Sequence, residues 1–369
     1  MIVNIQVLRA VAAVMVVCDH VLFDWHHDLG NTFPHWLNTT VGSAGVDLFF
    51  VISGFIMLET TREGQTSPMS FLRKRLIRIA PLYWALVIVQ AIRTYKGDPS
   101  QVDLEWLAQS LLFLPHVEGN MQHAAFPSSY FPILFVGWTL IFEMFFYAIF
   151  AVALTLRRSR WWPFVVPAFF LTMMTGAHWV NNSYLNYYDH PIILEFLYGM
   201  AIAAFPPTSS MRRLDSAPVA GIIVGAGFAG LVLGDFFFGE MRTMRAFMYG
   251  IPAAAIVYGA IRLERRGYVA NNRLLLSVGA ASYSLYLIHP FFLSKVEGLL
   301  IAHPPAHFLP ALVIYACAIA CTVVLALLSY SFFERPTQRY LTRRFDVGST
   351  RAKDATGAIV RRPWAKAAD

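Results

Sequence analysis

Long apolar runs, separated by short polar stretches, dominate the chain. A helix that crosses the hydrocarbon core of a bilayer needs about 20 mostly apolar residues, whereas a membrane β-strand needs about 10 residues with strict alternation. The runs here are longer than such strands and do not alternate, so they predict an all-α polytopic membrane bundle of about ten transmembrane helices. The candidate segments are 7–24, 41–58, 77–93, 131–156, 161–176, 191–206, 217–236, 245–261, 275–295 and 309–333.

Two stretches depart from this simple pattern. Residues 104–114 are amphipathic and too short to span a bilayer, so they predict an interfacial or re-entrant piece. Pro163 and Pro167 predict an irregular start for the fifth segment. The short loops predict one membrane domain over residues 1–345, followed by a basic, disordered cytoplasmic tail over 346–369.

The composition excludes a cytosolic globular enzyme and a disordered protein. Of the 369 residues, 57% are hydrophobic and only 14% are charged, against roughly 25% charged residues in an ordinary soluble domain. The mean hydropathy of +0.52 agrees with this. A soluble domain needs more charge than this on its surface.

The positions of the basic residues explain the net charge of +7. If the N-terminus is cytoplasmic, 24 of the 29 Lys and Arg residues fall in cytoplasmic segments. This asymmetry follows the positive-inside rule and predicts an N-in/C-in topology. The basic charge therefore faces lipid and cytoplasm, which argues against a nucleic-acid partner.

The first segment carries two ionisable residues on one helical face. Arg9 and His20 are 11 residues apart, which places them within about 20° of each other and about 16.5 Å apart along a helix axis. Arg9 would lie at the cytoplasmic mouth and His20 near the middle of the membrane. Ionisable residues are costly inside a bilayer and commonly serve a function there.

Glu143 falls about halfway along the fourth segment, at the depth predicted for His20. A neutral histidine is a general base near physiological pH, and a carboxylate can orient it. Depth alone therefore suggests that Glu143 pairs with His20. The alternative is a polar clamp between two helices.

Three further features have a structural and a functional interpretation. Asp47 lies a third of the way into the second segment, where a charged side chain is costly and is therefore expected to have a role. Arg73, Arg75 and Arg78 form either a positive-inside anchor or a phosphate site, because Arg75 and Arg78 share one helical face and guanidinium forks suit phosphate oxygens. His289 lies toward the outer end of the ninth segment, where it could simply cap a kink at Pro290.

No pattern of metal ligands is visible, so we expect no metal. Cys18, Cys317 and Cys321 all fall inside predicted helices and form no disulfide framework. Nucleotide-binding loops and nucleophile elbows are also lacking in the sequence.

Six stretches, in order, resemble the landmarks of acyltransferase family 3, a family of bacterial integral-membrane acyltransferases. The Ile-Gln-Val-Leu-Arg opening is most similar to the exopolysaccharide and O-antigen O-acetyltransferase branch. The similar stretches are Ile5–His20, Gly45–Phe55, Arg73–Trp84, Trp138–Tyr147, Ser282–Pro290 and Phe332–Pro336.

The resemblance implies an enzyme of the bacterial inner membrane that moves an acetyl or similar acyl group from acetyl-CoA to a polysaccharide hydroxyl. The acceptor would be an exported polysaccharide or its lipid-linked precursor, and synthesis or export machinery and membrane lipid would be partners. By the same resemblance, the catalytic residues would be His20, Glu143 and Asp47, the donor-binding residues Arg9, Arg73, Arg75 and Arg78, and the acceptor-path residues Trp138, Tyr147 and His289.

Two other functions remain open at this point. A transporter or flippase for a glycan or lipid-linked sugar would also use ten helices with charges at mid-membrane, but it would favour an internal repeat, which we do not see. A structural partner of a polysaccharide synthase would not require so many intramembrane ionisable groups.

Overall fold

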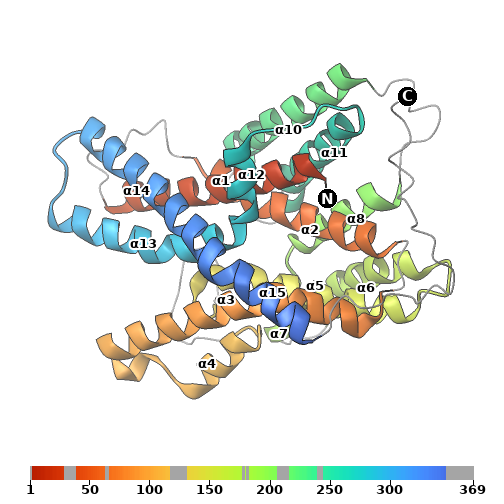
Figure 1. Ribbon diagram of the computed structural model, residues 1–369, viewed down its shortest axis with the longest axis horizontal. Coiled ribbons are helices and arrows are strands. Elements are labelled where there is room, and N and C mark those ends of the chain that lie inside the picture. Colours follow the sequence, from red (N-terminus) through yellow and green to blue (C-terminus); the bar gives the residue numbers. More distant parts are fainter. Residues whose placement is uncertain are drawn as a thin grey trace.

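The computed structural model describes residues 2–28, 39–62, 66–116, 131–176, 179, 183–205, 216–238 and 244–345. The predicted tail, 346–369, lies outside these residues. Every regular element in the described part of the chain is helical (Figure 1). The longer elements are α1 (Val3–Asp28), α2 (Ala44–Thr61), α3 (Pro68–Gly97), α4 (Leu104–Leu111), α5 (Trp138–Thr155), α6 (Trp162–Gly176), α7 (Ser183–Tyr188), α8 (Ile193–Ala204), α10 (Ala217–Phe238), α11 (Ile251–Arg265), α12 (Arg273–Ala280), α13 (Ser282–Ala302), α14 (Phe308–Ser329) and α15 (Arg335–Arg344).

Short helical turns join or extend several of these helices. Three are 3₁₀ turns, η3 (Val41–Ser43), η4 (Pro99–Gln101) and η5 (Phe135–Gly137). Two are π-helical turns, η8 (Ala246–Gly250) before α11 and η9 (Tyr330–Glu334) between α14 and α15.

The all-α polytopic membrane bundle is confirmed. All ten predicted segments form helix, and across the described residues eight helices are long and apolar enough to cross a membrane. The segments 161–176 and 191–206 form α6 and α8, with 15 and 12 residues. A helix of that length rises only about 18–23 Å, so the two are short for a straight crossing.

The structure divides one of the predicted segments and continues another beyond its predicted end. The ninth breaks at Ala281 into α12 and α13, and the tenth passes through η9 into α15. The hydrophobic pattern carries no signal for the first break, because α12 and α13 are both apolar. In contrast, η9 lies where the apolar run ends, and the α15 that follows it is rich in arginine. A π-helical turn inserts one residue into the helix and so rotates the following side chains. Glu334, at the end of η9, is buried and accepts a hydrogen bond from the Ser284 hydroxyl at 2.6 Å.

Helix α1 lies at the centre of the bundle and packs against α2, α11, α12 and α13 (Figure 1). Its neighbour α2 crosses α8 at very short range. A Cβ added to Gly54 would lie 2.0 Å from the carbonyl oxygen of Phe196, and one added to Gly199 would lie 2.0 Å from that of Val51. Small residues that let two backbones touch are typical of membrane helix packing.

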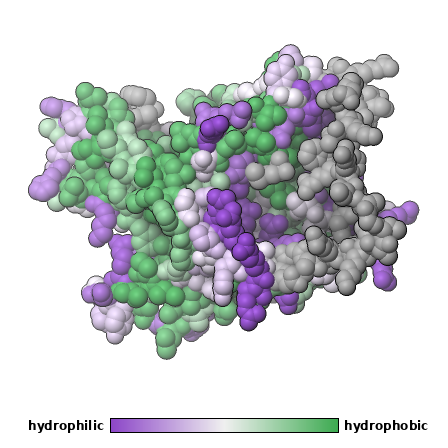
Figure 2. All heavy atoms as spheres, in the orientation of Figure 1, coloured by the Kyte–Doolittle hydropathy of each residue, from purple (hydrophilic) through white to green (hydrophobic). Residues whose placement is uncertain are grey.

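The outer surface is largely apolar, as expected for a lipid-facing protein. Phe236, Leu299 and Phe332 are 79%, 66% and 80% exposed. Hydrophilic side chains instead gather along α15, which crosses the front of the molecule in Figure 2. The short amphipathic piece predicted within 104–114 is α4, whose buried Trp106 donates a hydrogen bond to the carbonyl of Phe131 at 2.9 Å.

Candidate functional site

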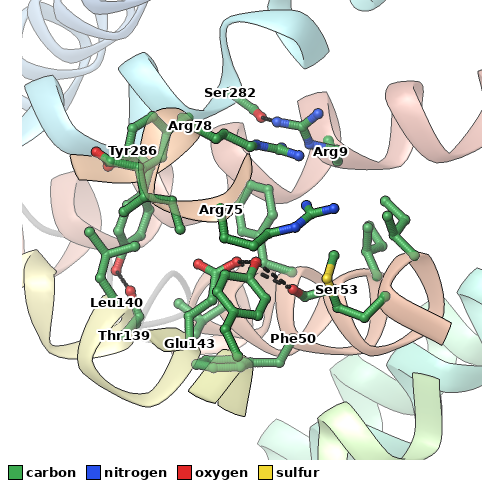
Figure 3. Close-up of a pocket in the computed structure, with 18 residues that line it drawn as sticks. Arg9, Phe50, Ser53, Arg75, Arg78, Thr139, Leu140, Glu143, Ser282 and Tyr286 are labelled. Atoms are coloured by element: carbon green, nitrogen blue, oxygen red, sulfur yellow. Dashed lines mark hydrogen bonds between the residues drawn. The ribbon is translucent and has the colours of Figure 1, made fainter. Parts of the chain in front are cut away.

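An open cavity lies between α1, α2, α3, α5 and α13 (Figure 3), and its empty space, including the solvent at its mouth, is about 750 Å³. Each of these helices contributes side chains to its wall. The lining residues are Arg9, Val46, Phe49, Phe50, Ile52, Ser53, Ile56, Met57, Arg75, Arg78, Ile79, Thr139, Leu140, Glu143, Tyr147, Ser282, Tyr283 and Tyr286.

Three guanidinium groups gather on one side of the cavity, from Arg9, Arg75 and Arg78 (Figure 3). Arg9 donates to the Ser282 hydroxyl at 2.8 Å and, more weakly, to the Gln6 side-chain oxygen at 3.3 Å. Within the described residues, none of the three arginines forms an ion pair with a carboxylate. The cavity wall therefore carries three guanidinium groups against one carboxylate, Glu143, and none of the three is closed off in an ion pair.

Arg75 is held by aromatic rings rather than by an acid. Its guanidinium carbon lies 5.5 Å from the ring centroid of Phe71 and 5.7 Å from that of Tyr147. Its Nε is buried and has no hydrogen-bond partner within the described part of the chain. A buried donor without a partner is rare, and this one belongs to a side chain that lines an open cavity.

Glu143 lies across the cavity from the arginines, and two hydroxyl groups hold it. The Ser53 hydroxyl donates to Glu143 Oε1 at 3.2 Å, and the Tyr147 hydroxyl donates to the same oxygen. The predicted pairing of Glu143 with His20 is therefore wrong: the two residues make no contact with each other in the described structure. Equal depth on two helices does not decide which faces meet.

Apolar and aromatic side chains complete the wall. Phe49, Phe50 and Ile56 come from α2, and Tyr286 comes from α13. The Tyr286 hydroxyl donates to the carbonyl of Val136 at 2.9 Å and lies 2.9 Å from the Thr139 hydroxyl. Two hydrogen bonds thus hold Tyr286 in place as one wall of the cavity.

His20 lies behind this wall and does not line the cavity. Its Nδ1 is 2.9 Å from the carbonyl oxygen of Val16, and its ring meets the ring of His289 at a centroid distance of 4.8 Å. The ring of Tyr286 in turn lies 6.0 Å from that of His289. Tyr286, His289 and His20 therefore form a row that leads from the cavity wall to a partly exposed histidine.

Asp47 faces a different part of the bundle. Its carboxylate is fully buried and forms a two-point ion pair with Arg245, at 2.5 Å to Nη2 and 3.1 Å to Nε. Glu195 of α8 lies beside this pair, and its buried carboxyl group approaches the carboxyl group of Asp47. None of these three residues lines the cavity. We call them the Asp47 cluster.

The remaining predicted residues divide between the cavity and its surroundings. Tyr147 lines the cavity, whereas Arg73 is exposed on α3 and does not reach it. Trp138 also lies outside the lining, with its ring against Phe142 at 6.1 Å. His289, predicted on an acceptor path, is fully buried behind Tyr286.

Sequence reasoning missed the partners of these residues. Ser53, Ser282 and Tyr286 lie in the quoted motif stretches, but nothing in their spacing assigned them to the cavity. Glu195 had a signal that we did not use, since it is an acidic residue inside the apolar run 191–206. Arg245 begins the predicted segment 245–261, but nothing in the sequence indicated that it would form an ion pair with the buried Asp47.

The structure holds no candidate metal centre among its described residues, in which no three His, Cys, Asp or Glu side chains are grouped to bind an ion. The three cysteines are free thiols.

Comparisons with known proteins agree with the resemblance seen in the motifs. A family model described as an acyltransferase domain matches residues 2–331. The chain is 35% identical over 314 residues to the exopolysaccharide production protein ExoZ of Rhizobium meliloti, a match that covers 81% of this chain and 90% of that protein. It is 25% identical over 360 residues to the O-acetyltransferase OatA of Staphylococcus aureus, covering 90% of this chain but only 56% of OatA. No solved structure matches.

Proposed function

The chain belongs to acyltransferase family 3, and from that membership we propose that it moves an acyl group from acyl-CoA to a hydroxyl of a polysaccharide. Acetyl is the acyl group that we expect, because one relative is named as an O-acetyltransferase. The acceptor would be an exported polysaccharide or its lipid-linked precursor, because another is named for exopolysaccharide production.

The observation that carries the proposal is the convergence of Arg9, Arg75 and Arg78 on one cavity without carboxylate partners. Unpaired guanidinium groups in a partly dry site are strong ligands for phosphate oxygens. Coenzyme A carries a diphosphate and a further phosphate on its ribose, and its pantetheine arm is less polar. The apolar wall made by Phe49, Phe50 and Ile56 suits such an arm.

The proposed orientation places this arginine side of the cavity toward the cytoplasm, where acyl-CoA is made. The distribution of Lys and Arg along the chain supports an N-in/C-in topology in a bacterial inner membrane. The acceptor and the enzymes that make or export it would then meet the protein near His20. The same distribution supports a cytoplasmic tail over 346–369.

His20 is the group that we assign as general base. Because a carbonyl oxygen only accepts hydrogen bonds, the Val16 carbonyl favours the tautomer with the proton on Nδ1. The lone pair on Nε2 is then free to take the proton of an acceptor hydroxyl. The hydroxyl oxygen attacks the thioester carbon, the carbon–sulfur bond breaks, and the leaving thiolate takes that proton from His20. The products are the ester and free coenzyme A.

The distance along α1 imposes a condition on this reaction. Arg9 and His20 are 11 residues apart, or about 16.5 Å along the axis. A donor whose phosphates lie on the arginines must therefore extend its arm past Tyr286 to bring the thioester to His20. Glu143 would form part of the wall on which the donor lies. Asp47 would have a structural role through its ion pair with Arg245, away from the reacting atoms.

The test is coenzyme A release by the purified full-length protein supplied with acetyl-CoA and a candidate glycan. Removing a general base costs about 100- to 10,000-fold in rate, so His20→Ala should lose release while remaining monodisperse in detergent. His303→Gln, at the exposed end of α13, serves as the control and should behave as wild type. Wild-type acetylation by His20→Ala would overturn the assignment, and transport of a glycan without thioester use would overturn the function.

A further inference from the structure

The cavity wall contains three guanidinium groups and one carboxylate, yet the carboxylate does not pair with them. Glu143 lines the same cavity as Arg9, Arg75 and Arg78. Opposite charges in a site partly removed from water attract each other strongly, because little solvent screens them. Within the described part of the chain, Glu143 nevertheless forms no ion pair. Some feature of the site must therefore hold the carboxylate away from the arginines.

The Tyr147 hydroxyl contacts both the carboxylate and one of the cations. It donates a hydrogen bond to Oε1 of Glu143, which lies one helical turn earlier on α5. The guanidinium carbon of Arg75 lies 5.7 Å from the centroid of the Tyr147 ring, and the guanidinium approaches the Tyr147 hydroxyl. One hydroxyl thus joins the anion to the cation, and two hydrogen-bond lengths keep them at most about 6 Å apart.

Ser53 holds the same carboxylate from α2. Its hydroxyl donates to Oε1 of Glu143 at 3.2 Å (Figure 3). A carboxylate oxygen has two lone pairs, so Ser53 and Tyr147 together occupy this one. The two neutral donors fix the position of Glu143 without removing its charge.

The charge of Glu143 acts on the arginines from this distance. Arg9 and Arg75 are each repelled by Arg78. Both are attracted by Glu143. In the empty cavity the carboxylate therefore offsets part of the repulsion among the cations. A direct ion pair would do the same, but it would also occupy the guanidinium donors that a phosphate group needs.

We propose that Tyr147 is a positioning residue for Arg75: its hydroxyl holds Glu143 one hydrogen bond away, so that Arg75 stays open to a phosphate group of the donor. This role rests on the proposed function, in which the phosphates of acyl-CoA bind the arginines. Tyr147 then serves the donor side of the cavity rather than the acceptor path that the family resemblance implied. The Nε of Arg75, buried and without a partner among the described residues, is a donor left for such a ligand.

The test measures the binding of coenzyme A to the full-length protein in detergent by isothermal titration calorimetry. Tyr147→Phe keeps the ring that packs on Arg75 and Phe71 and removes only the hydroxyl. Glu143 then loses a donor and pairs with Arg75. We expect the Kd for coenzyme A to rise about 10-fold, and the KM for acetyl-CoA to rise in parallel with kcat within about twofold of wild type.

The decisive variant combines Tyr147→Phe with Glu143→Gln. A glutamine carries no charge and forms no ion pair with Arg75, so the double variant should bind coenzyme A within about twofold of Glu143→Gln alone. A tyrosine needed only for packing would weaken binding equally in both backgrounds. Tyr249→Phe is the matched control, because it removes another tyrosine–carboxylate hydrogen bond, to Asp235 at 2.7 Å, outside the cavity lining. It should leave the Kd unchanged.

A second variant keeps the test decisive if Tyr147→Phe does not give monodisperse protein. Ser53→Ala removes the other donor to Oε1 of Glu143 and leaves the Tyr147 ring in place. The Kd for coenzyme A should then rise about 2- to 5-fold, as expected for the loss of one hydrogen bond. Glu143→Gln in the same chain should again remove the rise.

Two results would overturn the role of Tyr147: a wild-type Kd in the single variant, or equal weakening in the single and double variants. Both results leave the proposed function intact as long as the wild-type protein binds coenzyme A and Arg75→Ala weakens that binding. If the wild-type protein does not bind coenzyme A, or if Arg75→Ala binds it as tightly as wild type, the phosphate site is wrong and the role of Tyr147 is wrong with it.

Discussion

The arginine-lined cavity and the Asp47 cluster are two places where the interior of the helical bundle holds charged side chains, and they hold them in opposite ways. In the cavity, Arg9, Arg75 and Arg78 face about 750 Å³ of open space and form no ion pair among the described residues. In the Asp47 cluster, a guanidinium and a carboxylate meet at 2.5 Å, and the carboxylate is 0% exposed. One region leaves three cations without an ion-pair partner, and the other joins its cation directly to a carboxylate.

The difference separates binding from scaffolding. In a buried ion pair, each charge has its partner within the protein. Removing one partner leaves the other charge uncompensated in a medium of low polarity. Cations that line an open cavity gain their partner only when an anion enters. Both regions contain residues from the same sequence motifs, so motif membership alone does not tell which role a charged residue plays.

The largest expected effect is on folding, from Arg245→Met. Removing this cation leaves Asp47 and Glu195 buried together, and breaking a buried ion pair costs about 3–5 kcal/mol. We expect a marked loss of thermal stability in detergent. The double variant Asp47→Asn with Arg245→Met should unfold at a higher temperature than the single variant. A wild-type melting temperature for Arg245→Met would remove the distinction between the two regions.

The next effect is on donor binding, from Arg75→Ala. Hydrogen bonds to charged groups contribute about 1.5–3 kcal/mol, which corresponds to a rise of roughly 10- to 150-fold in the KM for acetyl-CoA. The KM for the acceptor and the melting temperature should stay near wild type. Arg75→Lys should lie between the two, because an ammonium cannot replace the fork of a guanidinium. An unchanged donor KM would show that Arg75 is only a topological anchor.

A smaller effect is expected for Glu143→Gln. The amide oxygen can still accept from Ser53 and Tyr147, so the cavity wall should keep its shape. Losing one negative charge near the arginines should leave the donor KM unchanged or slightly lower it, and kcat should fall less than about 10-fold. Steady-state kinetics decide this. A loss of kcat as large as that in His20→Ala would place Glu143 among the reacting groups.

The smallest effect is expected for Arg73→Ala. Arg73 belongs to the same basic run as Arg75 and Arg78, but it is exposed and does not line the cavity. Surface substitutions usually stay within about 0.5 kcal/mol, or roughly a factor of two. Donor KM and stability measured beside Arg75→Ala provide the check. A rise in donor KM equal to that of Arg75→Ala would extend the phosphate site beyond the cavity.

Periodicity and hydrophobicity predicted the helices well because each apolar run is a local property of the chain. All ten predicted segments form helix, and the piece predicted within 104–114 forms the short α4. The break at Ala281 and the π-helical turn at Tyr330–Glu334 could not be predicted, since side chains on other helices bind the residues around them, as Ser284 of α13 binds Glu334. Arg9 binds Ser282 just after the first break.

The candidate site, like the fold, was predicted only where the prediction depended on local spacing along one helix. The spacing of Arg75 and Arg78 on one face predicted that they would act together, and the structure brings them into one cavity with Arg9. The pairing of Glu143 with His20 was wrong, because depth along a helix is one coordinate and the direction of a side chain around the axis is another. The direction follows from how helices cross, which no single segment encodes.

The sequence by itself determined that lipid is the solvent, that the chain is helical, and to which family its motifs belong. These follow from composition, from runs of about 20 residues and from short motifs. Only the tertiary structure decided which polar residues meet: Arg9 with Arg75 and Arg78, Asp47 with Arg245, and His20 with His289. Helices that cross as closely as α2 and α8 do at Gly54 and Gly199 set the rotation of every side chain along them.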